Sequence, residues 1–170
     1  MSFTKKIFLV GMPGSGKSTV GRLLAARLGL DFYDLDSEIE LGQDRSIADI
    51  FEDGEENLFR RIESATLLRF LKRENRFVMA TGGGTPCFHN GIKLMNESGV
   101  TVYLDTPIDI LINRTGKKLH RPLLQSNRDS TIKKLLNDRQ SCYSQAIYAL
   151  DTAALSLDQK IDKIISLSTE

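Results

Sequence analysis

The 170-residue sequence contains no tryptophan, two cysteines, two histidines and no surplus of charge of either sign. Cys87 and Cys142 are far apart in the sequence, with no second cysteine pair and no histidine spacing around them. Neither a disulfide framework nor a zinc site is therefore expected. The net charge of +1 offers no basic surplus to hold a polyanion, which argues against nucleic acid as a partner.

Long apolar runs are also missing. The first apolar run ends at Val10, is broken by Gly11 and Pro13, and is too short for a signal peptide or a membrane span. We therefore expect a cytoplasmic protein without a membrane partner. The length fits a single domain over residues 1–170, and we expect that domain to be a monomer.

What the sequence does contain is Gly-Met-Pro-Gly-Ser-Gly-Lys-Ser at residues 11–18. It follows a strand-like run and precedes an amphipathic segment, as the phosphate-binding motif G-x-x-x-x-G-K-[ST] requires. Its backbone N–H groups can surround phosphates, Lys17 can reach the β- and γ-phosphates, and the Ser18 hydroxyl can ligate Mg²⁺. The alternative is a glycine-rich turn that binds nothing. The predicted nucleotide-binding residues of this loop are Gly14, Ser15, Gly16, Lys17, Ser18 and Thr19.

Two acids, Asp34 and Asp36, stand at the end of a predicted short strand over residues 32–36. In an extended chain they share one face, and ligands of open α/β sheets bind at strand ends, so both carboxylates should face the reacting phosphate. The alternative is a pair of turn-forming aspartates, with Asp36 capping the next helix.

Three successive glycines, Gly82, Gly83 and Gly84, follow the apolar run Phe77–Ala80, which is typical of a strand covered on both faces. They permit a very close approach of the backbone to another group. The alternative is a loop that merely needs positive φ.

Arg139 falls in the middle of an apolar helical stripe between Asp129 and Ala146. Burial of a guanidinium is costly unless an anion meets it, so an internal acid or a bound substrate anion should lie opposite. A snorkelling or internally paired arginine is the alternative.

Residues 115–122 are basic and lack apolar periodicity, which predicts a mobile lid over the site; a solvated loop without a role is the alternative. Five strand-like runs alternate with helices along the whole chain. This pattern predicts a three-layer α/β fold, in which helices flank a five-stranded parallel sheet with the 7–10 strand near its centre.

Taken in order, the P-loop, the two aspartates, Phe59-Arg60, the triple glycine, residues 121–124 (Arg-Pro-Leu-Leu) and Arg139 resemble the pattern of the shikimate kinases over nearly the whole chain. This resemblance implies a nucleoside-monophosphate-kinase-like P-loop fold. It also implies transfer of a phosphoryl group from ATP, with Mg²⁺, to the 3-hydroxyl of shikimate in aromatic amino-acid biosynthesis.

The resemblance also implies roles for single residues. Asp34 would bind the shikimate hydroxyls and accept the proton, and Asp36 would support Mg²⁺ through water. The segment from about residue 34 to 62 would bind substrate. One extra residue separates Gly54-Glu55 from Phe59, but Phe59, Arg60 and Glu63 keep their mutual spacing, so the match falls on Arg60 and not on Arg61. The shikimate-binding set is Asp34, Arg60, Gly82, Gly83, Gly84 and Arg139.

On the nucleotide side, the resemblance places Arg114 over the adenine and Arg121, in the lid, against the phosphates. With Asp34 and Lys17, Arg121 completes the implied catalytic set. Two rival functions remain open at this stage. One is a P-loop kinase of another small acceptor such as gluconate or a nucleoside monophosphate, and the other is a nucleotide-binding module without turnover.

Overall fold

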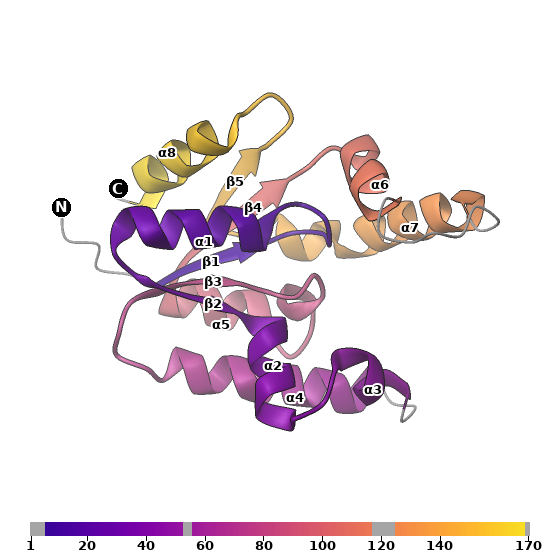
Figure 1. Cartoon of the computed structure of the whole chain (residues 1–170), viewed down its shortest axis with the longest axis horizontal. Coiled ribbons are helices and arrows are strands. Elements are labelled where there is room, and N and C mark those ends of the chain that lie inside the picture. Colours follow the sequence, from indigo (N-terminus) through magenta and orange to yellow (C-terminus); the bar gives the residue numbers. More distant parts are fainter. Residues whose placement is uncertain (1–5, 53–55, 117–124, 169–170) are drawn as a thin grey trace.

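The computed structural model of the chain describes residues 6–52, 56–116 and 125–168. At its centre lies a five-stranded sheet of order β2-β3-β1-β4-β5, in which every pairing is parallel (Figure 1). The predicted fold class is confirmed, and the strand before the P-loop is the central one. The strands are β1 (Lys6–Val10), β2 (Asp31–Asp34), β3 (Phe77–Ala80), β4 (Gly99–Asp105) and β5 (Tyr148–Asp151).

Helices cover both faces of the sheet because side chains alternate along each buried strand. On β1, Ile7 and Leu9 pack against α1 (Lys17–Leu28) and α8 (Leu157–Ser168), while Phe8 and Val10 point to the opposite layer. That second layer contains α2 (Leu35–Gln43), α3 (Ile47–Glu52), α4 (Glu56–Leu71), α5 (Gly91–Ser98), α6 (Ile108–Gly116) and α7 (Gln125–Tyr143).

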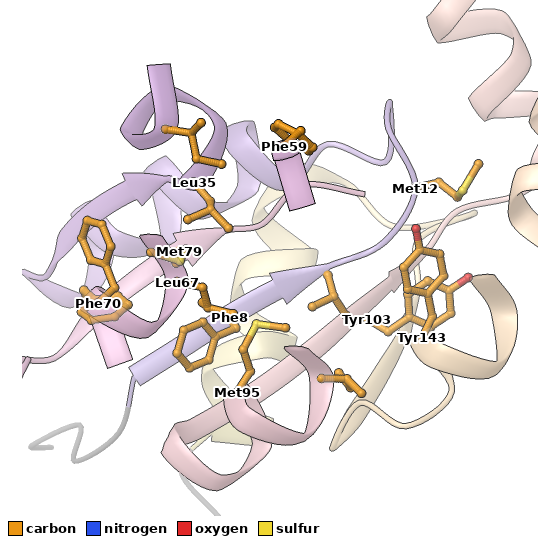
Figure 2. Packing of buried hydrophobic residues seen from close by; sticks show 14 of the residues in the cluster. Phe8, Met12, Leu35, Phe59, Leu67, Phe70, Met79, Met95, Tyr103 and Tyr143 are labelled. Atoms are coloured by element: carbon orange, nitrogen blue, oxygen red, sulfur yellow. The ribbon is translucent and has the colours of Figure 1, made fainter. Parts of the chain in front are cut away.

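Aromatic rings fill the core of the second layer. The Phe77 ring meets the Phe8 and Phe70 rings edge to face, with centroids 5.8 and 5.9 Å apart. At the other end of the same cluster, Tyr103 of β4 stacks on Tyr143 of α7 (Figure 2). These contacts hold α4 and α7 against the sheet.

The carboxyl ends of β1, β2 and β3 bring the P-loop, Asp34 and the glycine triplet to one edge of the sheet, as the parallel topology requires. One detail of the prediction is wrong. Strand β2 ends at Asp34, and Asp36 lies in the first turn of α2. Asp34 is the N-cap of that helix, and its carboxylate accepts the Asp36 N–H at 3.2 Å, so the two acids do not share an extended segment.

The predicted lid lies largely outside the described residues. Thr115 and Gly116 belong to α6, which shortens the proposed segment at its start, whereas residues 117–122, Arg121 among them, are not described. Within the described part of the chain, no helix is both long and apolar enough to cross a membrane.

Candidate active site

The P-loop joins β1 to α1 through glycines that adopt conformations L-residues avoid. Gly14 has φ +85°, and Gly16, the N-cap of α1, has φ +93°. The helix therefore starts with its free N–H groups pointing into the loop, which is the arrangement that binds phosphate.

Lys17 is buried in this loop, with 8% of its surface exposed. Its Nζ donates to the carbonyl oxygens of Gly11 and Met12, both at 2.9 Å. An ammonium has three N–H donors, so one remains for a phosphate oxygen. Burial lowers the pKa of Lys17 to about 8, against the opposing effect of the Asp36 and Asp34 carboxylates.

Both predicted acids lie beside the P-loop. The Ser18 hydroxyl donates to the Asp34 carboxylate at 2.5 Å, which joins α1 to the end of β2. Burial, followed by the nearby charges of Asp34 and Glu63, raises the pKa of Asp36 to about 6, although Lys17 opposes this. Negative charge is therefore crowded at this point.

A cavity of about 890 Å³ opens over the loop. Arg114 of α6 crosses its rim, and its Nη1 donates to the Gly14 carbonyl at 3.1 Å. Among the predicted site residues, the cavity is lined by Gly14, Ser15, Gly16, Lys17, Ser18, Thr19, Asp34, Asp36, Gly83 and Arg114. Thr115, the first residue of the predicted lid, also lines it, and so do residues that the sequence did not single out: Pro13, Val20, Thr81, Leu157 and Lys160.

The glycine triplet allows three close approaches. A Cβ on Gly82 would lie 2.8 Å from Glu63 Oε1, and one on Gly83 would lie 2.7 Å from the Pro13 ring. A Cβ on Gly84 would lie 2.5 Å from Arg60 Nη1. None of the three glycines has positive φ, so the close-approach interpretation is confirmed and the alternative is wrong.

Arg60 of α4 is 8% exposed, and its guanidinium faces Gly84. It pairs with Glu63 at 2.8 Å and with Glu56 at 3.3 Å, and it lies 4.2 Å from the centroid of the Phe88 ring. Arg61 is exposed. The helix therefore turns Arg60, and not Arg61, toward the glycine loop.

Arg139 of α7 approaches the same loop from the other side. Its Nη1 would lie 3.0 Å from a Cβ on Gly83, and the residue is half-buried. Within the described residues no ion pair involves Arg139. Its charge is near enough to Lys17 to lower the pKa of that lysine. The two arginines thus flank neighbouring glycines, although neither lines the cavity over the P-loop.

Sequence reasoning used Glu63 only for its spacing to Arg60 and missed that Glu63 is the acid that pairs with Arg60. Glu63 is 2% exposed and accepts the Thr85 hydroxyl at 2.6 Å as well as the Arg60 guanidinium. Its position three residues after Arg60 was the available signal, since residues three apart on a helix are neighbours. The sequence also gave no sign that Cys87 and Cys142 lie close together, yet the two thiols are near enough to influence each other, and both remain free.

Comparison with known proteins decides what this site belongs to. A family model described as shikimate kinase matches residues 13–168. The chain belongs to the shikimate kinase family. A shikimate kinase of Persephonella marina is 40% identical over 161 residues, which are 95% of this chain and 97% of that protein. A shikimate kinase from Acinetobacter baumannii, solved in complex with shikimate, superposes with a TM-score of 0.86 at 37% identity, over 96% of this chain and 92% of that one.

The rival acceptor kinase finds weaker support. A gluconokinase from Sinorhizobium meliloti superposes with a TM-score of 0.66 at 18% identity, which shows a shared fold and no more. Membership of the shikimate kinase family therefore takes precedence over the gluconate alternative.

Proposed function

We propose that this protein is a kinase that transfers the γ-phosphoryl group of ATP to the 3-hydroxyl of shikimate. One observation carries the proposal: Arg60 and Arg139 bring two guanidinium groups to the adjacent glycines 84 and 83, directly beside a P-loop. A P-loop binds the donor nucleotide, and paired guanidiniums suit a carboxylate that must be held bidentately. Shikimate provides that carboxylate, and the family assignment agrees.

The residues beside the loop fit Mg²⁺, which a kinase of this family is expected to use. Ser18 offers a hydroxyl oxygen, and Asp36 offers a carboxylate that would act through water; oxygen ligands of this kind, completed by phosphates, are what Mg²⁺ takes in such sites. The pKa of Asp36 is raised first by burial and then by crowded negative charge, which a cation would offset. When bound, the ion would neutralise charge on the phosphates.

The chain's own residues would do the rest. Lys17 would direct its free N–H to the transferring phosphoryl group, since that group carries negative charge spread over its oxygens during transfer. Asp34 would orient the acceptor hydroxyl and take its proton. The Gly82–Gly84 loop would hold the ring, and Arg114 would lie over the adenine. Arg121, outside the described residues, remains the predicted third catalytic residue, and a cytoplasmic monomer remains the predicted state.

Measurement of ADP release with a panel of acceptors tests the proposal. Shikimate should give rapid, Mg²⁺-dependent ADP formation, whereas quinate, gluconate and nucleoside monophosphates should leave the rate near the background without acceptor. Equal release with and without shikimate would rule the proposal out. A higher rate with gluconate would favour the rival kinase, and nucleotide binding without any turnover would favour a binding module.

A further inference from the structure

Tyr143, in the last turn of α7, connects the two parts of the proposed acceptor site. Its side chain is fully buried, and its hydroxyl donates to the Gly83 carbonyl oxygen at 2.6 Å. Arg139, one helical turn earlier, lies close enough for its positive charge to act on the same hydroxyl. The phenolic oxygen therefore binds the glycine loop at the point where Arg139 of α7 approaches it.

The hydrogen bond from Tyr143 to Gly83 fixes the distance between α7 and the loop after β3, which no pairing of strands determines. Gly83 follows β3, whereas Arg139 lies on α7, and the two are far apart in the sequence. The Gly83 backbone and the Arg139 guanidinium nevertheless approach so closely that a Cβ would lie 3.0 Å from Nη1. The 3-10 turn Thr85–Cys87 after the glycines also packs on α7, so without the hydroxyl link the Gly83 end of the loop alone could shift, and the pocket for a carboxylate would widen.

The ring and the hydroxyl of Tyr143 have separate tasks. The ring stacks on Tyr103, with centroids 5.0 Å apart and planes 24° apart, which holds the side chain in place (Figure 2). The hydroxyl serves Gly83. Burial raises the pKa of Tyr143 above its ordinary value, so the hydroxyl stays protonated and remains a donor at neutral pH. Removal of the oxygen alone would therefore leave the packing and delete the link.

We infer that Tyr143 is a positioning residue for acceptor binding, whose hydroxyl sets the spacing between Gly83 and Arg139. The inference rests on the proposed function, because the carboxylate that Arg139 meets is that of shikimate. Tyr143 would act on the affinity for shikimate through the placement of Gly83 and Arg139, and not by contact with a substrate.

The test compares Tyr143→Phe with Tyr103→Phe in the full-length protein. Tyr103 is the matched control: it is 3% exposed, stacks on the same ring and donates to Asp105 at 3.1 Å, and no contact joins its hydroxyl to Gly83 in the described structure. Both changes remove one buried hydroxyl and keep the ring. We expect Tyr143→Phe to raise the KM for shikimate about 5- to 30-fold, with the KM for ATP within twofold of wild type. Tyr103→Phe should change neither KM by more than twofold.

A second readout separates positioning from stability. In a double-mutant cycle with Arg139→Lys, the effects on the shikimate KM should combine less than additively, because Tyr143 acts through the placement of Arg139. A lowered Tm with an unchanged shikimate KM in Tyr143→Phe would overturn the inference, and so would an equal rise of KM in Tyr103→Phe. If wild type turns over shikimate, these outcomes overturn the inference alone. If wild type does not, the proposed function fails and the inference fails with it.

Discussion

The charged form of Asp36 lowers the stability of the folded chain. Its carboxylate is half-buried near Asp34 and Glu63, and its pKa rises from an ordinary value of 3.8 to about 6. The folded state therefore binds a proton more tightly than the unfolded state does. Between about pH 4 and pH 6 this difference lowers the free energy of unfolding as the pH rises, and the full cost is present above pH 6.

Replacement of Asp36 by Asn should remove that cost. We expect Asp36→Asn to raise the free energy of unfolding at pH 7 by about 1 to 3 kcal/mol, and to have little effect below pH 4. Turnover should fall sharply at the same time. Urea unfolding at pH 4 and pH 7 measures the effect, with exposed Asp31→Asn as the control. Equal stability changes at both pH values would contradict the account.

Arg139 presents a positive charge for which the described residues provide no ion-pair partner. Loss of one partner of a desolvated charge pair costs roughly 2 to 5 kcal/mol, so Arg139→Ala should weaken shikimate binding about 30-fold to several thousandfold. ATP affinity should change little. Arg139→Lys keeps the charge without the planar fork and should fall between the two.

Calorimetric titration and thermal unfolding on the same samples distinguish this role from a structural one. If Arg139 merely supports the helix, the Ala variant will melt at a lower temperature and still bind shikimate as tightly as wild type.

At the scale of elements, the loop after β3 fits between α4 and α7 only because it has no side chains there. Gly84→Ala would bring a methyl group to 2.5 Å from Arg60 Nη1, so the arginine must move away from its partner Glu63. We expect the KM for shikimate to rise about 10- to 100-fold, with the KM for ATP nearly constant, in steady-state kinetics.

Gly42→Ala is the matched control for this substitution. Gly42 lies in α2, where the nearest atom to a new Cβ is Arg69 Nη2 at 3.9 Å. Alanine favours a helix over glycine by up to about 1 kcal/mol, so this variant should keep wild-type kinetics and melt slightly higher. Equal damage from both substitutions would mean that the close approach at Gly84 has no special role.

The strands and the P-loop could be predicted from the sequence because local patterns determine them. Burial of polar residues that face the site could not. On α4, Leu58 and Leu68 are both 39% exposed, whereas Arg60, Glu63 and Thr66 are buried together with Phe59, Leu67 and Phe70. Arg60 and Glu63 are buried there because they meet the glycine loop. The start of helix α2 at Leu35 was not predicted either, because Asp34 was interpreted as a site residue within a strand, whereas it is also the N-cap of this helix.

Contacts between segments that are far apart in the sequence could not be predicted from local sequence patterns. The hydroxyl link from Tyr143 to Gly83 and the meeting of Cys87 with Cys142 depend on how α7 packs against the loop after β3. Arg139 was the exception, because a guanidinium within an apolar stripe is visible in the sequence alone.

For the whole molecule, the proposed acceptor site consists of residues from four segments that are far apart in the sequence and come together only in the folded chain. Asp34 ends β2, Arg60 lies on α4, Gly83 follows β3 and Arg139 lies on α7. A ligand that contacts all four should stabilise the folded state against global unfolding. At a concentration of 100 times its Kd, shikimate should add about 2.7 kcal/mol, which for a chain of this size raises Tm by roughly 5 to 11 °C.

Differential scanning fluorimetry with shikimate and with its methyl ester checks this expectation. The ester lacks the negative charge that the arginines should bind, so at the same concentration it should raise Tm far less. Equal shifts for the acid and the ester would show that Arg60 and Arg139 do not recognise the carboxylate.

The central place of β1 has a consequence for how the protein is made. Its Ile7 lies beside Val78 of β3 and Val100 of β4, both of which follow far later in the chain. At roughly 5 to 20 residues per second, a ribosome needs about 5 to 20 s to advance from β1 to β4. Until β3 has been made the apolar strand has neither neighbour, and until β4 has been made it has only one, so the P-loop behind it lacks its full support. The nascent chain therefore cannot bind nucleotide until more than half of it has been synthesised, and β1 is the segment most exposed to aggregation on the way.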